Sequence, residues 1–204
     1  MKLRGNLMYL ILIPALAAVV ANPRVASAAS IYNFDSDTPG TVTPFVDTNN
    51  GLAATFGGGA AVCDVTGFFD TLSGNALIQN LCVAEGSGPL SIAFGSDVSS
   101  ISFDFATAGG ANTDTLTAFE GMTTVGSATF SSTVPGGGFD GEGFASLSGV
   151  FNSITFSSNT GDLLAIDNVN ATATPEPSTL TLLIAPLGLA SLVLRRRFLA
   201  RRNA

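Results

Sequence analysis

Short runs of alternating apolar and polar residues recur along the middle of the chain. The segment 101–105 reads Ile-Ser-Phe-Asp-Phe, and the segment 90–94 reads Leu-Ser-Ile-Ala-Phe. Alternation with a period of two places the apolar side chains on one face of a β-strand. The other segments that we predict to be strands are 31–34, 52–56, 115–120, 123–130, 144–147, 154–156 and 163–169.

Glycine-rich breaks separate these runs, and no long amphipathic helix lies between them. Three consecutive glycines occur at 57–59 and again at 136–138, and such clusters mark loops. Many short strands at this spacing are typical of two antiparallel sheets packed face to face. The sequence therefore predicts one all-β domain over residues 29–174, an antiparallel β-sandwich of jelly-roll type.

Charge divides the chain into a middle part and two ends. Of the fifteen acidic residues, all except Glu176 lie within 29–174, so this middle part carries 15 − 1 = 14 carboxylates and no lysine or arginine. Such a surface repels phosphate backbones, which argues against nucleic-acid binding and makes divalent cations its natural counterions. The eight basic residues are Lys2, Arg4, Arg24, Arg195, Arg196, Arg197, Arg201 and Arg202.

The N-terminal end has the order of parts that defines a secretory signal. Lys2 and Arg4 precede an apolar run at 7–21, and Ala26-Ser27-Ala28 supplies small residues for signal peptidase. A permanent anchor is the alternative, but the run is short for a membrane span and Pro14 interrupts it. We predict a signal peptide at 1–28, cleaved after Ala28 or one residue later.

Export has a consequence for the two cysteines, Cys63 and Cys82. Both would lie in an oxidising compartment, where a pair of thiols forms a disulfide. Closing this loop would stabilise the fold by about 3 kcal/mol, chiefly through the unfolded chain. A catalytic thiolate would need a base such as histidine, and the chain contains none.

The C-terminal end also consists of three parts in order. Pro175-Glu176-Pro177 begins it, an apolar stretch follows at 180–194, and the cluster Arg195-Arg196-Arg197 comes next. The prolines keep the first part extended and accessible to an enzyme. By the positive-inside rule the arginines stay cytoplasmic, which leaves the Pro-Glu-Pro motif on the outer side of the inner membrane. A simple tail anchor would explain the last two parts but not the motif.

This arrangement closely resembles the PEP-CTERM sorting segment, over residues 174–204. The resemblance implies that the motif Pro175, Glu176 and Pro177 is recognised by an exosortase, a membrane-embedded transpeptidase of Gram-negative bacteria. It further implies an inner-membrane precursor that is delivered to the cell surface or the extracellular matrix, in connection with exopolysaccharide. Pro186, inside the apolar stretch, departs from the usual pattern.

Two short acidic stretches at the ends of the predicted domain suggest a metal site. Asn33-Phe34-Asp35 lies in the first predicted strand and Ile166-Asp167-Asn168 in the last. The second stretch resembles the last strand of carbohydrate-binding jelly rolls, which implies calcium held by Asp35, Asp37 and Asp167 with backbone carbonyls. The alternative is that these residues only make the local hydrogen bonds that aspartate favours in turns.

The middle part lacks the usual catalytic residues. It contains neither histidine nor lysine, and Tyr32 is its only aromatic residue other than phenylalanine. We therefore predict a non-enzymatic surface protein that depends on signal peptidase, exosortase and the inner membrane. The alternatives are a calcium-stabilised, lectin-like module that binds polysaccharide and, more remotely, a glycoside hydrolase with two carboxylates.

Overall fold

The computed structural model describes residues 29–174, except for 83–85, 87, 136–139 and 160–162. Its strands are β1 (Ala29–Tyr32), β2 (Phe45–Asn49), β3 (Leu52–Gly57), β4 (Ala60–Asp64), β5 (Asn75–Gln79), β6 (Leu90–Thr107), β7 (Thr113–Glu120), β8 (Thr123–Ser131), β9 (Gly141–Ser158) and β10 (Leu164–Ala173). All pairings between these strands are antiparallel. The predicted all-β class is confirmed.

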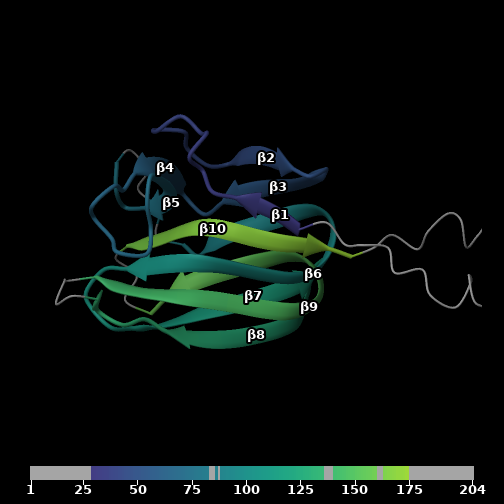
Figure 1. Ribbon diagram of the computed structural model, residues 1–204. Coiled ribbons are helices and arrows are strands. Elements are labelled where there is room, and N and C mark those ends of the chain that lie inside the picture. The colour runs from purple at the N-terminus through teal and green to yellow at the C-terminus, as the bar shows by residue number, and fades with distance from the viewer. Residues whose placement is uncertain (1–28, 83–85, 87, 136–139, 160–162, 175–204) are drawn as a thin grey trace, which may run out of the picture. The chain divides into compact units, whose positions relative to one another are not determined.

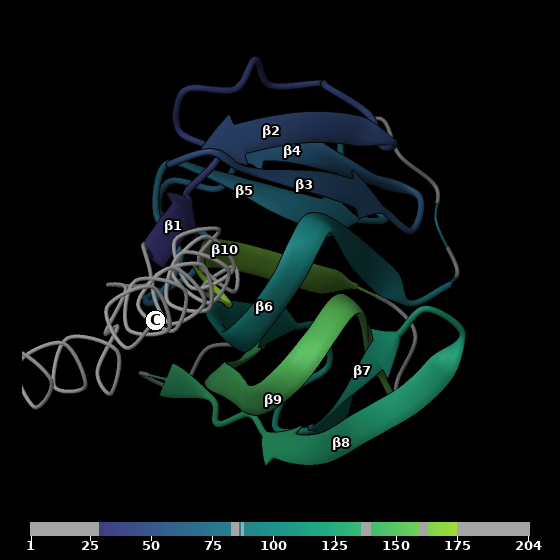
Figure 2. The ribbon, with the colours of Figure 1, turned by 90° about the vertical axis from the view of Figure 1, so that its right-hand side faces the viewer.

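Hydrogen-bonded pairing connects the ten strands into one sheet that folds over on itself. β6 and β9 are each 18 residues long, and their mutual register shifts around Ala93, Val98 and Ser100. At this bend both strands pass from one layer of the sandwich to the other (Figure 2). The predicted sandwich therefore forms from two long, bent strands together with shorter ones.

We name the two layers sheet A and sheet B. Sheet A contains β1, β4, β5 and β10 together with the second half of β6 and the first half of β9. Sheet B contains β2, β3, β7 and β8 together with the first half of β6 and the second half of β9. Figure 1 shows the layers from the side, and the names are used in this sense below.

Phenylalanine fills the space between the sheets, as the composition suggests. Phe56 meets Tyr32, Phe34 and Phe45 with ring centroids 5.1–5.6 Å apart. Phe156 forms a second aromatic group with Phe103 and Phe105, at 4.9 and 5.1 Å. Aromatic pairs at these distances contribute beyond the burial of their area.

A smaller apolar cluster lies on the opposite, outer face of sheet A. Residues 65–74, the β4–β5 loop, pack over it, with Leu72 fully buried against the sheet. The cluster is composed mainly of small residues of sheet A, among them Ala61, Cys63, Ala76, Ala106 and Ala165. Cys63 at its margin is bonded to Cys82, which confirms the predicted disulfide.

The two ends of the described domain lie next to each other. Ala29 of β1 is the register partner of Thr172 of β10, so the first and last strands are neighbours (Figure 1). The signal peptide at 1–28 and the C-terminal apolar stretch at 180–194, which we predict to form a signal helix and a transmembrane helix, fall outside the described residues. Within residues 29–174 as described, no helix is long and apolar enough to cross a membrane.

Most predicted strands are present, with three kinds of difference. The segments 90–94 and 101–105 belong to the single strand β6, and 144–147 and 154–156 both belong to β9. The first strand ends at Tyr32, because Phe34 adopts φ 55° and turns the chain. No strand was predicted at the positions of β2, β4 and β5, yet the structure has one at each.

Candidate functional site

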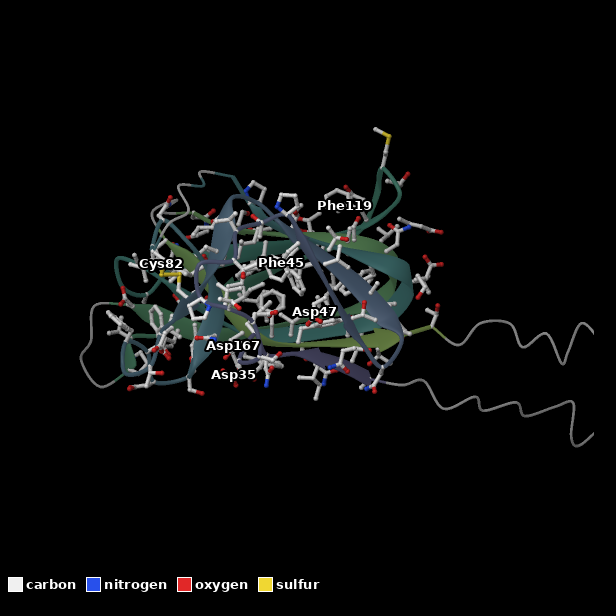
Figure 3. All side chains as sticks on the ribbon, turned by 90° about the horizontal axis from the view of Figure 1, so that it is seen from above. Asp35, Phe45, Asp47, Cys82, Phe119 and Asp167 are labelled. Carbon is white, nitrogen blue, oxygen red and sulfur yellow. A yellow bond between two sulfur atoms is a disulfide. The ribbon has the colours of Figure 1, made fainter. Side chains whose placement is uncertain are left out.

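Asp35 and Asp167, two of the three aspartates predicted to bind calcium, come together beside the β4–β5 loop. Asp167 lies in β10 and is only 2% exposed, and Asp35 follows β1 and is exposed. Figure 3 shows the two residues side by side, and their charges repel each other. The antiparallel pairing of β1 with β10 is what brings these distant residues together.

A local irregularity of β10 holds the Asp167 carboxylate. The register with β6 shifts between Asp167 and Asn170, and Asn168 adopts φ 52°. The backbone N–H of Asn168 donates to Oδ1 of Asp167 over 2.7 Å, and the backbone of Ser73 donates a second hydrogen bond. Such hydrogen bonds favour the charged form of a carboxylate.

Burial outweighs these hydrogen bonds. It raises the pKa of Asp167 to about 6, and the nearby carboxylates of Asp35 and Asp104 act in the same direction. Asp104 is the register partner of Asp167 on β6, and its Oδ2 accepts a hydrogen bond from Nδ2 of Asn168 over 3.0 Å. Asp167 is therefore a buried acid next to two other acids, in a domain whose sequence contains no lysine or arginine.

Asp35 is fixed by the end of the β4–β5 loop. Its Oδ1 accepts the backbone N–H of Asn75 over 3.0 Å. Gly74 makes this approach possible, because a Cβ there would collide with Oδ1 of Asp35, and the φ of +71° also favours glycine. The acid is thus placed by backbone contacts from a segment 40 residues away in sequence.

Asp37, the third predicted ligand, has a different environment. Its carbonyl accepts Nδ2 of Asn75 over 3.1 Å, while its carboxylate lies within electrostatic reach of Asp47. Burial, followed by repulsion from Asp47, raises the pKa of Asp37. Among the described residues no group of three or more histidines, cysteines or acids could hold a metal ion. The three aspartates do not form the predicted ligand set there, and calcium binding stays a prediction.

The remaining site residues of the sequence analysis lie outside the described residues. These are the motif Pro175, Glu176 and Pro177 and the cluster Arg195, Arg196 and Arg197. The signal peptide at 1–28 lies outside them as well. Sorting, export and membrane orientation therefore stay predictions.

The outer face of sheet B carries a feature that the sequence analysis did not single out. Three neighbouring strands, β9, β7 and β8, each present three hydroxyl side chains in register, and every one is exposed or half-buried. We call this set the hydroxyl array: Thr113, Thr115, Thr117, Ser127, Thr129, Ser131, Ser153, Thr155 and Ser157.

Alternation along the strands explains the hydroxyl array. On β7, Leu116 and Ala118 point into the core, so the threonines between them point out. Thr117 lies opposite Thr155 on one side and Ser127 on the other, with 3.4 Å between Oγ1 of Thr117 and Oγ of Ser127. The array contains no charged side chain. Its signal was visible in sequence as Thr-Asp-Thr-Leu-Thr and Ser-Ile-Thr-Phe-Ser.

A cavity at the margin of the sandwich is too small for a sugar ring. It measures about 130 Å³ and is lined by residues that include Gln79, Pro89, Ser157 and Leu164. Ligand pockets are typically several times larger, roughly 300–1,000 Å³. Nε2 of Gln79 already donates to the carbonyl of Gly88 over 2.7 Å. The open sheet face is the larger available surface.

Comparisons with known proteins show likeness in fold only. No protein-family model and no curated protein matches the sequence. Among solved structures, a family 29 carbohydrate-binding module is 12% identical, with a TM-score of 0.35 over 76% of this chain and 99% of that one. The CBM22-2 xylan-binding domain from Paenibacillus barcinonensis Xyn10C is 12% identical, with a TM-score of 0.36 over 72% and 99%.

A third solved structure belongs to an enzyme. The catalytic domain of a GH87 alpha-1,3-glucanase is 13% identical, with a TM-score of 0.37 over 74% of this chain and 28% of that one. Similarities this remote assign neither a ligand nor an activity to the chain.

Proposed function

We propose that this protein is an exported, non-enzymatic surface protein that is sorted through its C-terminal Pro-Glu-Pro segment. Its β-sandwich is the domain that sorting delivers to the surface. The observation that carries the proposal is the distribution of charge. Every lysine and arginine lies outside residues 29–174, in the two terminal segments that we predict to direct export and membrane insertion. A folded domain rarely lacks lysine and arginine altogether, because both are common on soluble surfaces.

The geometry of the domain supports the same proposal. β10 ends at Ala173, two residues before Pro175, and no element of the described domain extends into the predicted sorting segment. The pairing of Ala29 with Thr172 means that both connections leave from one place on the domain. A domain with adjacent ends can fold outside the membrane without strain from either connection.

Mass spectrometry of both ends of the exported protein tests the proposal. We expect an N-terminus at Ala29 or one residue later, and a C-terminus that has lost the apolar segment and the arginines. Glu176→Gln should leave the C-terminal segment attached, because it removes the charge of the motif. Glu120→Gln, on the exposed end of β7, is the control and should be processed normally. An intact polypeptide with both ends uncut would contradict the proposal.

A second candidate function, binding of neutral polysaccharide, is favoured by the hydroxyl array. The array is an open, uncharged face within a domain of fourteen carboxylates, and hydroxyl groups both donate and accept hydrogen bonds. An extended glycan presents the same groups. The array has few aromatic platforms, since Phe119 is the one aromatic residue of its three strands on that face, so we expect weak binding.

Affinity electrophoresis with soluble glucan, mannan and xylan tests this second function. Thr155→Asp puts a charge in the hydroxyl array, opposite Thr117 of its central strand β7, and should abolish any retardation by the polysaccharide. Ser146→Asp, on the exposed outer face of sheet A, is the matched control and should be retarded like the parent protein. Equal mobility of all three proteins in every gel would exclude the array as a glycan site.

A further inference from the structure

We propose that the free edge of β8 is a pairing site for β8 of a second copy of this chain. β8 lies at the margin of sheet B and forms a ladder with β7 alone among the described residues (Figure 2). The N–H and C=O groups on its other side therefore lack a strand partner in the described structure. An open strand edge is a template for pairing with another chain.

The edges at β4 and between β1 and β2 are covered. Residues 40–43 lie along β4 and hydrogen-bond to it, as in the contacts of Gly40 N–H with the Val62 carbonyl at 2.8 Å and of Thr43 N–H with the Ala60 carbonyl at 2.8 Å. β1 and β2 are bridged by side chains, because Nδ2 of Asn49 donates to the Ile31 carbonyl at 2.8 Å. These contacts occupy groups that would otherwise be open to a neighbour.

Sheet A ends on the first half of β9, and this edge is also partly covered. Thr133 exchanges backbone hydrogen bonds with Glu142 at 2.8 and 2.9 Å. Further along, the side chain of Leu147 lies against Gly126 of β8. β8, by contrast, has no backbone hydrogen bond on its outer side among the described contacts.

β8 also has few of the features that usually prevent an edge strand from pairing with another chain. Its sequence, Thr-Thr-Val-Gly-Ser-Ala-Thr-Phe-Ser, contains no charge and no proline. Edge strands are commonly protected by charged residues, proline or bulges. The one such device is the extra residue Val125, where the register with β7 shifts. Residues 126–131 beyond it remain regular.

The charge pattern identifies a second copy of the chain as the partner. In a two-fold symmetric pair, each residue near the axis meets its own counterpart, so any charge there would repel itself. The domain has fourteen carboxylates and no cation, yet residues 121–139 contain no charge at all. Antiparallel pairing of residues 126–131 therefore joins two copies at a part of the surface that carries no charge.

The direction of β8 determines where the chain ends of the two copies lie, a consequence that rests on the proposed surface attachment. β8 starts at the end of the sandwich where β10 stops (Figure 1). Antiparallel pairing therefore places the chain ends of the two copies at opposite ends of the pair. Such a pair would join copies held on facing surfaces, or copies released from them, and not neighbours on one flat membrane.

Sedimentation of the exported protein, purified in mild detergent, tests the pairing independently of sorting. We expect a dimer that the double variant S127D/T129D weakens at least about tenfold, because it places four like charges across the joint. The matched control T48D/T55D adds the same charge to exposed positions of β2 and β3 on sheet B and should dimerise like the parent. A monomeric parent protein, or equal weakening by both variants, would overturn the proposal.

Cysteine cross-linking gives a second readout that does not depend on affinity. Both native cysteines are in the disulfide Cys63–Cys82, so Thr129→Cys, near the middle of residues 126–131, introduces a single free thiol close to its counterpart in the second copy. We expect a disulfide-linked dimer of this variant under mild oxidation and none of Thr55→Cys. Cross-links of Thr129→Cys only to other proteins, or ladders of higher oligomers, would overturn the assignment of a second copy.

Discussion

The outer faces of the two sheets differ in the charged residues that they carry. Sheet A carries Asp104, Glu142 and Asp167 on its outer face, two of them buried beneath the β4–β5 loop. On the outer face of sheet B, the hydroxyl array has no charged residue. In a domain without cations, acids on a sheet must be satisfied by backbone amides or remain neutral. On sheet A, backbone amides bind both Glu142 and Asp167, and burial also raises the pKa of Asp167. The hydroxyl array of sheet B carries no acid, whereas Asp114 of β7 is buried on the inner face of that sheet, where burial raises its pKa.

The largest expected effect concerns Glu142, the acid on sheet A that backbone amides satisfy. Its carboxylate accepts the N–H groups of Asp70 and Thr71 at 2.8 and 2.6 Å and the hydroxyl of Thr71 at 2.5 Å. Glu142→Ala would leave these donors of the β4–β5 loop without an acceptor and should lower the free energy of unfolding by about 4 kcal/mol.

Thr155→Ala on sheet B is the matched change for this comparison. Thr155 lies in the hydroxyl array and no buried donor depends on it in the described structure, so its loss should change the free energy of unfolding by less than about 0.5 kcal/mol. Urea denaturation of both variants measures the difference. Equal losses of stability would show that the two faces do not differ as described.

The next effect concerns Asp167, the acid on sheet A whose ionisation burial disfavours. Its pKa of about 6 lies above the ordinary value of 3.8, so the folded state disfavours its ionisation. The stability that the protonated acid provides is complete below about pH 4 and is lost as the pH rises through 6. Asp167→Asn should therefore be more stable than the parent protein at pH 7, by up to about 3 kcal/mol, and should melt at a higher temperature. At pH 4 it should bring no gain.

Asp64 provides a control of opposite sign. Hydrogen bonds from Thr66 lower its pKa below the ordinary value, so its ionisation favours the folded state. Asp64→Asn should bring no gain in stability at pH 7. The test is to measure the melting temperatures of Asp167→Asn, Asp64→Asn and the parent protein between pH 4 and pH 8. A pH profile of Asp167→Asn that parallels the parent would contradict the raised pKa.

Alternation along the chain predicted the strands whose two faces differ. β7 and the two halves of β6 each have one apolar face toward the core and one polar face, so their period of two is visible in sequence. β4 and β5 are buried on both faces, because the β4–β5 loop covers the outer one. Their continuous apolar character hides the period of two. β2 is a short edge strand with too few alternating residues to detect.

The candidate site was predictable only as far as the strand pairing. Terminal acids at Asp35 and Asp167 were expected to meet because a sandwich brings first and last strands together, and they lie side by side. The position of Asp37, where burial and repulsion from Asp47 raise its pKa, depends on the turn after Phe34 and on the contacts of Asn75. Contacts between loops distant in sequence have no periodic signal, so this part could not be predicted.

The smallest expected effect is that of calcium, and it tests the remaining pair of acids on sheet A. A divalent cation would relieve the repulsion between Asp35 and Asp167, and two carboxylates with carbonyls and water give only millimolar affinity. We therefore expect 10 mM calcium to stabilise the protein by about 1 kcal/mol at pH 7. The gain should disappear at pH 5, where Asp167 is protonated, and in Asp35→Asn. Asp37→Asn should keep it, because that carboxylate faces Asp47. Identical melting temperatures in calcium and in chelator at pH 7 would show that calcium does not bind to this pair of acids.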